Sequence, residues 1–368
     1  MNKIPILDLQ PEIQFLRDKL NAAFQDVLHS GQFIMGPQVK ALEAELADFL
    51  GVKHAITLNS GTDALVIGLR ALGINEGDEV ITTPFTFYAT AEAIQHVGAR
   101  TVFVDINPEN FNINTETLEE KITDRTKAII PVHLFGQAAN MTSLLALAQK
   151  YKVKIIEDVA QAFGGTYRNK MLGSIGDVGC FSFFPSKNLG AYGDGGLLAT
   201  NSDEVAEVAK MLRSHGSKRK YYNELVGYNS RLDEIQAAVL RIKLPYIQEW
   251  NDKRRQAAAY YSEALRDIRG IQVPQEESYG KHVYHQYTIR ITNGKREALK
   301  TYLEDQGISS MVYYPTPVHK LPIFEDVHES FPASEQAAAE VLSLPIWPNI
   351  QREIQDRIIS IIKDFIYR

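Results

Sequence analysis

Over its N-terminal two thirds, the chain alternates short β-rich runs with segments of helical spacing, and this alternation is the strongest constraint on its fold. The strand candidates are residues 79–82, 101–104, 128–132, 154–156 and 197–200. Such alternation implies crossover connections, a mostly parallel sheet and helices on both of its faces. Because ligands of open α/β sheets bind beyond the carboxyl ends of the strands, the polar residues that follow these runs are candidate functional groups.

The character of the sequence changes near Pro245. Residues 246–268 are charged, rich in alanine and periodic, as in a long connecting helix. The chain then becomes aromatic and proline-rich before a last amphipathic stretch at residues 351–367. We therefore expect two domains, a large α/β domain over residues 1–245 and a smaller α+β domain over residues 246–368.

Composition excludes several classes of protein. The 368 residues are 45% hydrophobic and 23% charged, which suits a folded core, and a net charge of −6 without a long basic stretch disfavours nucleic-acid binding. The single cysteine, Cys180, allows neither an internal disulfide nor a cysteine-based zinc site, and we expect no metal site. No stretch approaches the roughly 18 apolar residues of a membrane span, and no signal peptide is evident. We expect a cytoplasmic protein without a membrane partner.

The first chemical candidate is the segment SGTDALVIGLRAL, which starts at Ser60. A small, glycine-containing turn precedes a strong helix former there. Free backbone N–H groups at the helix start, together with the hydroxyls of Ser60 and Thr62, form a candidate anion site. The alternative interpretation is that Ser60 or Thr62 merely caps the helix.

The segment KVKIIEDVAQAFGG places acidic residues at the end of an apolar run. A strand there carries Glu157 and Asp158 to its carboxyl end, and Gln161 follows about one helical turn later. A carboxylate at this position suits a cationic ring nitrogen, and an amide suits a phenolic oxygen. The alternative is that both acids favour the start of the next helix.

The segment GCFSFFPSKNLGAYGDGG, which begins at Gly179, carries the sharpest signal. Lys187 lies between an aromatic run and a glycine-rich stretch, where burial lowers the pKa of an amine and makes it available for a Schiff base. Ser182, in the strand-like run before it, is a candidate phosphate contact, and the glycines allow close backbone approach. The stretch is neither a dinucleotide fingerprint nor a P-loop. The alternative is a solvated surface lysine.

Four motifs follow one another over nearly the whole chain: SGTDAL, EDVAQAFGG, FSFFPSKNLGAYGDGG and GYNSRLDEIQAAVL. Together they resemble the DegT/DnrJ/EryC1/StrS family of pyridoxal-phosphate (PLP) nucleotide-sugar aminotransferases. The resemblance implies the aspartate aminotransferase type of fold, PLP fold type I. It also implies a homodimer whose active sites lie at the subunit interface.

The resemblance further implies roles for individual residues. Lys187 would form the Schiff base with pyridoxal 5′-phosphate, and Asp158 would hold the pyridine nitrogen protonated, so these two are the expected catalytic residues. The other expected coenzyme contacts are Gly61, Thr62 and Ser182 at the phosphate, Phe87 stacked on the ring, Gln161 near the ring hydroxyl, and Asn229 reaching the phosphate from the neighbouring subunit. Core packing is the alternative for Phe87, and a turn is the alternative for Asn229.

The expected reaction is amino transfer, because Lys187 stands where one dehydratase branch of the family has histidine. The resemblance implies L-glutamate as donor and a nucleotide-linked keto-hexose, a dTDP- or UDP-sugar, as acceptor in the biosynthesis of deoxyamino sugars. Two half-reactions through one site predict ping-pong kinetics. Motif details favour amination at C3 over C4. Tyr313, where some relatives that act on uronic-acid sugars have histidine, favours a neutral 6-deoxy sugar.

The expected substrate contacts are Arg231, Tyr313, Tyr314 and His319. The basic run formed by Lys218, Arg219 and Lys220 is a further candidate for the pyrophosphate. A solvated basic loop and an aromatic hairpin in the core are the alternative interpretations of these two groups.

Two other functions fit parts of the sequence. A PLP-dependent amino-acid aminotransferase needs an arginine for the substrate carboxylate, and Arg290 is available for it. A desulfurase is disfavoured, because Cys180 lies in a strand-like run and not on a mobile loop. A non-catalytic regulator that binds a sugar nucleotide is the second alternative, although retention of both Lys187 and Asp158 argues against it.

Overall fold

A computed structural model describes residues 3–367 of the chain. Its central sheet is mostly parallel, and only β9 runs antiparallel to its neighbours. Across the sheet, the strands of the described residues follow the order β1 (His54–Leu58), β9 (Gly196–Thr200), β8 (Val178–Ser182), β5 (Lys154–Asp158), β4 (Thr126–Ile129), β2 (Glu79–Thr82) and β3 (Arg100–Phe103). The predicted α/β fold class is confirmed.

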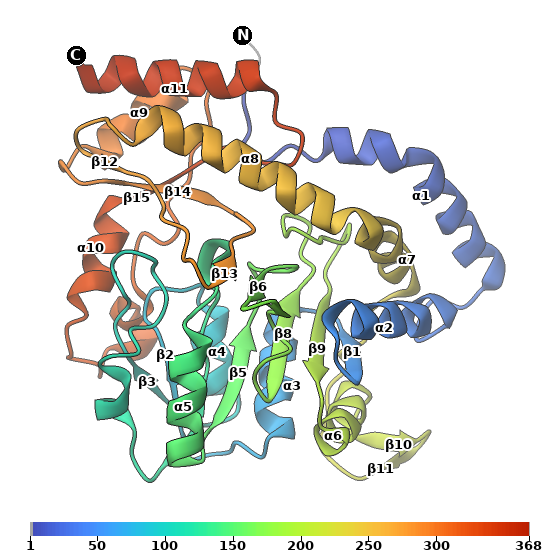
Figure 1. Ribbon diagram of the computed structural model, residues 1–368. Helices are drawn as coiled ribbons and strands as arrows, with labels where there is room; N and C mark the ends of the chain where they lie inside the picture. Colours follow the sequence, from blue (N-terminus) through green and yellow to red (C-terminus); the bar gives the residue numbers. More distant parts are fainter. Residues whose placement is uncertain (1–2, 368) are drawn as a thin grey trace.

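Helices cover both faces of this sheet (Figure 1). One face packs on α2 (Pro37–Leu50) and α5 (Met141–Tyr151); the other packs on α3 (Gly61–Ala71), α4 (Ala89–His96) and α6 (Asp203–Arg213). Strand alternation explains the two cores, because successive side chains point to opposite faces. In β5, Ile155 joins the core on the α5 side and Ile156 joins the core on the α3 side.

The five predicted strands all occur, with boundaries shifted by up to three residues. Two strands are additional: β1, which no predicted run covers, and β8, the strand-like run before Lys187. Both form antiparallel ladders with β9. Shorter strands lie outside this sheet: β6 (Thr166–Tyr167), β7 (Lys170–Met171), β10 (Ser217–Arg219), β11 (Tyr222–Asn223) and β13 (Gly280–Lys281).

The C-terminal part is organised around the long helix α8 (Ile247–Leu265), which follows α7 (Glu234–Lys243) and runs diagonally above the central sheet (Figure 1). It leads into a three-stranded antiparallel sheet. The elements of this part are β12 (Ile271–Gln272), β14 (Tyr287–Ile291), β15 (Val341–Leu344), α9 (Arg296–Asp305), α10 (Pro332–Glu340) and α11 (Arg352–Tyr367).

The N-terminal segment crosses to this C-terminal part. Ile4 pairs with Ile308 in a parallel bridge and is buried in the same cluster as Tyr261 and Ile358. The chain then continues into α1 (Gln10–Ser30), which packs on α7. The domain limits at residue 245 stay a prediction.

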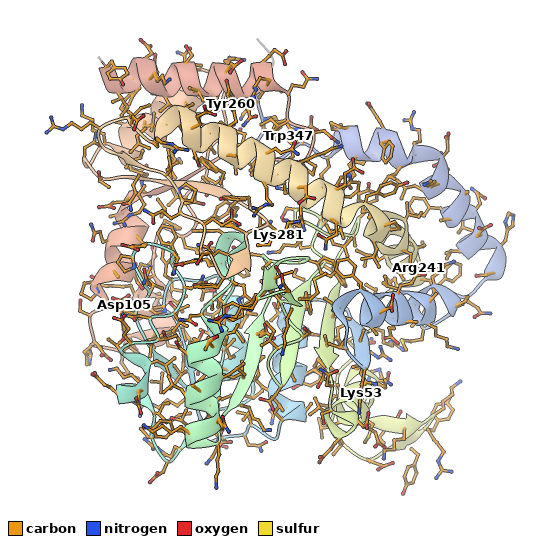
Figure 2. All side chains as sticks on the ribbon, viewed as in Figure 1. Lys53, Asp105, Arg241, Tyr260, Lys281 and Trp347 are labelled. Carbon is orange, nitrogen blue, oxygen red and sulfur yellow. The ribbon has the colours of Figure 1, made fainter. Side chains whose placement is uncertain are left out.

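Asp105 ties the two parts together further. It follows β3, and its carboxylate accepts hydrogen bonds from the backbone N–H groups of Ala333 (2.9 Å) and Ser334 (2.9 Å) at the start of α10. Figure 2 labels Asp105 beside this helix. A carboxylate at a helix N-terminus satisfies donors that the helix itself leaves unpaired. Among the described residues, no helix is both long and apolar enough to cross a bilayer.

Candidate active site

Asp158 is the last residue of β5 and is 6% exposed. Its carboxylate accepts hydrogen bonds from the Thr90 hydroxyl (2.9 Å), on α4, and from the Ala160 N–H (3.1 Å). Burial raises the pKa of this carboxyl group, and the hydrogen bonds from Ala160 and Thr90, together with the charge of Lys187, partly oppose that rise. Asp158 is therefore a buried acid whose ionised form needs a nearby cation.

Lys187 follows β8 through the FFPSK turn, where its N–H donates to the Phe184 carbonyl (2.8 Å). The residue is partly exposed, but removal of its amine from water lowers the pKa to about 8, and the charge of Asp158 opposes this shift. A substantial neutral fraction near pH 8 makes this amine a competent nucleophile and base. The structure thus brings the two predicted catalytic residues into one electrostatically coupled site.

Gln161 and Tyr314 extend this site. The Gln161 side-chain oxygen accepts from the Phe135 N–H (2.7 Å), and its amide nitrogen donates to the Tyr314 hydroxyl (2.8 Å). The Tyr314 ring lies 6.1 Å from the ring of Phe87, which is 59% exposed. Tyr314 therefore joins the C-terminal part of the chain to the carboxyl end of the central sheet, and the Phe87 ring stays accessible.

The start of α3 lies directly against Ser182. A Cβ atom placed on Gly61 would lie 2.7 Å from the Ser182 Cβ, so only glycine allows this approach. The Ser60 hydroxyl caps the helix by accepting from the Asp63 N–H (3.1 Å), as the alternative interpretation of this residue expects. The remaining N–H groups of the first turn, which include that of Thr62, have no partner inside the helix.

The next candidates, Asn229, Arg231 and the basic run, lie in the segment between α6 and α7. Asn229 is exposed and bridges to Ser214, and the basic run of residues 218–220 lies in the exposed β10–β11 hairpin. Lys218 forms an ion pair there with Glu207. The Arg231 Nε atom is buried, and among residues 3–367 it has no hydrogen-bond partner.

His319 and Tyr313 lie in separate surroundings. His319 is buried between Phe103 and Phe331, and its Nε2 lies 3.3 Å from a Glu335 oxygen. Burial lowers the pKa of His319. Tyr313 instead lines a small cavity together with Arg254 and His285.

Glu157 differs from its neighbour Asp158. Its carboxylate is fully buried and accepts from the N–H groups of Gly173 (2.9 Å), Ile175 (2.8 Å) and Gly176 (2.7 Å). His133 completes the set at 3.0 Å; its Nδ1 accepts from the Ala139 N–H, so its Nε2 carries the proton donated to Glu157. Glu157 therefore holds a turn and a histidine in place.

Sequence reasoning missed Thr90 and His133, which surround the two acids. His133 follows the predicted strand at residues 128–132, so the rule that polar groups follow strand ends points to it. Thr90 gives no comparable signal, because a threonine near a helix start is common. Cys180 is buried, and its thiol donates to the Ala64 carbonyl (3.2 Å), which fits a structural role.

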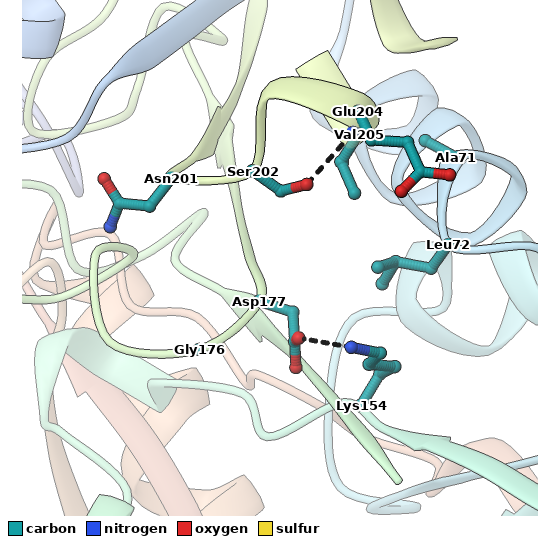
Figure 3. A pocket seen from close by; sticks show the side chains of 9 residues that line it. All are labelled: Ala71, Leu72, Lys154, Gly176, Asp177, Asn201, Ser202, Glu204 and Val205. Atoms are coloured by element: carbon teal, nitrogen blue, oxygen red, sulfur yellow. Dashed lines mark hydrogen bonds and ion pairs between the residues drawn. The ribbon is translucent and has the colours of Figure 1, made fainter. Parts of the chain in front are cut away.

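A roomier cavity lies elsewhere on the sheet. It has a volume of about 480 Å³ and includes Lys154, at the first residue of β5, and Asp177, which forms a 2.9 Å ion pair with it (Figure 3). Because Asp158 ends the same strand, this cavity and the Lys187 cluster lie at opposite ends of β5.

Comparisons with known proteins agree with the motifs. The sequence pattern of the DegT/DnrJ/EryC1/StrS aminotransferase family matches residues 14–363. A protein of Geobacillus stearothermophilus named pleiotropic regulatory protein is 46% identical over 367 residues, which are 98% of this chain and 98% of its own length. A UDP-N-acetyl-3-dehydro-alpha-D-glucosamine 3-aminotransferase of Acidithiobacillus ferrooxidans is 46% identical over 361 residues, 98% of this chain and 97% of its own length.

The fold agrees as well. The crystal structure of S. venezuelae DesV in complex with a ketimine intermediate has a TM-score of 0.97 at 40% identity, and the match covers 100% of each chain. Relatives that are 40–46% identical include enzymes named as UDP-sugar and dTDP-sugar aminotransferases of position 3. Because the family pattern and these relatives span nearly the whole sequence, the chain belongs to the DegT/DnrJ/EryC1/StrS aminotransferase family.

Proposed function

We propose that this protein is a PLP-dependent aminotransferase that moves the amino group of L-glutamate to C3 of a nucleotide-linked keto-hexose. The observation that carries the proposal is the coupled pair of Lys187 and Asp158 at the carboxyl end of the sheet. The lysine is about half neutral at its pKa of about 8, and the aspartate is buried and forms no ion pair among residues 3–367.

The residues present fit PLP. The coenzyme, when bound, supplies an aldehyde for the amine and a cationic ring that accepts the electrons of a broken C–H bond. Asp158 provides the carboxylate for the ring nitrogen, and Thr90 and the Ala160 N–H fix its position. The first turn of α3 at Gly61 and Thr62, packed on Ser182, provides N–H and hydroxyl donors for a phosphate.

Lys187 has two roles in the proposed reaction. Its side-chain nitrogen would hold the coenzyme covalently, and as a neutral amine it would accept and return the proton of the donor α-carbon. Gln161, held by Phe135 and Tyr314, is the proposed contact of the ring hydroxyl, and the exposed Phe87 ring is the proposed stacking surface.

Arg231 is the strongest candidate for the nucleotide pyrophosphate, because its buried Nε is without a partner among residues 3–367. Tyr313 and the exposed basic run remain weaker candidates. His319 is already packed between aromatic rings and paired with Glu335, which supports a structural role. Amination at C3 is supported by the names of the 40–46% identical relatives. The neutral 6-deoxy sugar and the cytoplasmic location stay predictions.

One alternative function is weakened by the structure. Arg290, the arginine available to bind an amino-acid substrate in the small domain, is paired with Glu340 (2.7 Å) and donates to the Pro108 carbonyl (3.0 Å). It is therefore occupied by internal partners. The Geobacillus relative is named a regulatory protein, so regulation is the second alternative function. The spectroscopic experiment below separates regulation from catalysis.

A homodimer with shared active sites is part of the proposal. It is supported by the exposure of Asn229 and by the strongly exposed apolar side chains of Tyr221 (89%) and Val226 (97%) in the same region. Mixing Lys187→Ala and Asn229→Ala subunits should restore activity at one site of each hybrid dimer. No recovery despite proven subunit exchange, with each parent inactive, would contradict a shared site.

The test of the function is spectroscopic. Protein loaded with PLP should be yellow, L-glutamate should bleach it, and the correct keto sugar should restore the colour. Borohydride reduction and peptide mapping should find the label on Lys187, and NMR of the product should place the nitrogen at C3. A protein that binds sugar nucleotides but never bleaches with any amino donor would support the regulatory alternative.

A further inference from the structure

Arg254 is a buried cation on α8 that is held between this helix and the C-terminal sheet. Only 4% of the residue is exposed. Its Nη1 donates to the carbonyl oxygens of Tyr284 (3.4 Å), His285 (3.4 Å) and Ile346 (3.3 Å). Desolvation lowers the pKa of the guanidinium to about 10. These three contacts are long, and they use a single nitrogen.

Arg254 differs from the other buried cations in its lack of a carboxylate partner. Arg213 is paired with Glu43, Arg290 with Glu340, and Lys243 with Glu12. Among residues 3–367, no carboxylate lies within ion-pair distance of Arg254. Burying a charge is costly unless a counter-ion or a full set of hydrogen bonds compensates it. Three carbonyl contacts to one nitrogen leave the rest of the guanidinium uncompensated.

The unused part of the guanidinium is the part that recognises carboxylates. Among the described residues, neither Nε nor Nη2 of Arg254 forms a hydrogen bond. Neither nitrogen is completely buried. These two nitrogens share one edge of the planar group, which presents two parallel N–H donors to the two oxygens of a carboxylate. The carbonyl contacts of Nη1 hold this edge in a fixed orientation.

This arginine shares a cavity with Lys187. Both residues line it together with Leu7, Trp250 and Trp347. A second cavity brings Arg254 together with Ser186, His285 and Tyr313. The charges of Lys187 and Arg254 both act on His285, whose pKa is held well below its ordinary value mainly by burial. Arg254 and Lys187 thus face one shared cavity.

The acids at this cavity are already engaged. Glu12 pairs with Lys243, and Asp8 accepts from the Gln10 N–H (2.9 Å). The charge of Glu12 reaches Arg254 through space, but among residues 3–367 no carboxylate binds its guanidinium directly. The cavity therefore offers an incoming anion a fixed cation whose donors are not already paired with an acid.

We propose that Arg254 binds a carboxylate of the amino donor and so positions the donor beside Lys187. The proposal rests on the proposed function, since it assigns the donor-binding residue of that same site. In this proposal, a carboxylate of the substrate is the ion-pair partner that Arg254 lacks. L-Glutamate has two carboxylates, and the experiment distinguishes its α-carboxylate from its γ-carboxylate.

The test compares the two half-reactions in PLP-loaded wild type, Arg254→Gln and Arg254→Lys. The matched control is Arg255→Gln, because Arg255 is the next residue of α8 and pairs instead with Glu276. In Arg254→Gln, the glutamate concentration for half-maximal bleaching should rise about 10- to 100-fold. Reaction of the aminated coenzyme form with the keto sugar should change less than about threefold, and Arg254→Lys should recover part of the loss.

A binding measurement without turnover completes the test. Glutarate has two carboxylates but no amine, so calorimetry reports its binding without reaction. Its affinity should fall in Arg254→Gln and stay unchanged in Arg255→Gln. With L-alanine as donor, an equal loss assigns Arg254 to the α-carboxylate, and a loss confined to glutamate assigns it to the γ-carboxylate.

Several results would overturn the inference. Unchanged glutarate affinity in a folded Arg254→Gln protein, or equal loss in both half-reactions, would assign Arg254 to structure alone. Should Arg254→Gln fail to fold, Arg254→Lys decides, because it keeps the charge and loses the two-donor edge. If wild type never bleaches with glutamate, the proposed function fails, and the glutarate measurement still decides whether Arg254 binds a carboxylate.

Discussion

The two ends of strand β5 each carry a lysine and an aspartate, in opposite settings. At the amino end, Lys154 and Asp177 form a 2.9 Å ion pair whose side chains are 51% and 33% exposed. At the carboxyl end, Asp158 is buried and Lys187 is only partly exposed, and desolvation displaces the pKa of each toward its neutral form. The same residue types are inert in water and reactive when desolvated. Cavity volume does not mark the proposed active site, because the roomy cavity of Figure 3 lies at the other end of β5.

A pair of lysine substitutions tests this comparison most directly. Lys187→Ala should lower amino transfer by at least about 1,000-fold, because it removes both the covalent anchor and the proton carrier. Lys154→Ala should leave the rate unchanged. Single-turnover bleaching with L-glutamate measures both. Normal turnover by Lys187→Ala would refute the assignment of the site to this end of the sheet.

Substitutions of the adjacent acids Glu157 and Asp158 on β5 provide a second test of the comparison. Glu157→Ala should lower the free energy of unfolding by about 3 kcal/mol or more, because three N–H groups and His133 lose their acceptor inside the protein. Asp158→Asn should lower the rate about 100-fold or more. Without coenzyme at pH 7, the thermal unfolding midpoint of Asp158→Asn should not fall below that of the wild type. The raised pKa of the Asp158 carboxyl group means that folding disfavours its ionised form, which the substitution removes. Denaturant and thermal melts of both variants check this.

The desolvation of Lys187 predicts a pH dependence. Below its pKa of about 8, the neutral fraction of the amine falls about tenfold per pH unit, and the rate of Schiff-base formation with added PLP should follow it. Between pH 8 and 10.5, the unfolded chain binds more protons at this residue than the folded chain does. The stability of the coenzyme-free protein should therefore rise across that window relative to Lys187→Ala. If the difference in unfolding free energy between the two proteins does not change with pH across this window, the lowered pKa of Lys187 is contradicted.

The smallest effect is expected at the amino end. Lys154→Ala should change the free energy of unfolding by about 0.5 kcal/mol or less, since exposed ion pairs contribute little. Asp177→Ala should cost about 1–2 kcal/mol, because the other Asp177 oxygen accepts from the Ile155 N–H (2.9 Å). Neither change should alter turnover. A large loss of activity in either variant would show that the two ends of β5 are coupled.

The sequence predicts the chemical groups of the proposed site better than it predicts the structure that supports them. Motif order predicts Lys187, Asp158 and Gln161 as site residues, and alternation predicts the parallel strands, because both are local signals. Adjacent acids could not be told apart from sequence. Alternation along β5 directs Glu157 and Asp158 to opposite faces, and only the fold shows that a tight turn at residues 173–176 meets the first of them.

Long-range contacts account for the remaining differences. Strand β1 owes its place to pairing with β9, which is far away in the sequence. Arg254 gives no sequence signal at all, because its distinguishing property is that, among residues 3–367, no carboxylate lies within ion-pair distance of it. That property arises only when α8, the segment at His285 and the segment at Ile346 come together.

The bridge between Ile4 and Ile308 has a consequence for the order of folding during synthesis. The first strand-like residues leave the ribosome early, but their partner emerges only after the whole central sheet has been translated. Until then Ile4, and the Ile6 carbonyl that later accepts from the Ile346 N–H, have no surface to bind. The central sheet can thus assemble on the nascent chain, whereas the segment at Leu7, which lines the cavity shared by Lys187 and Arg254, waits for release of the C-terminal part.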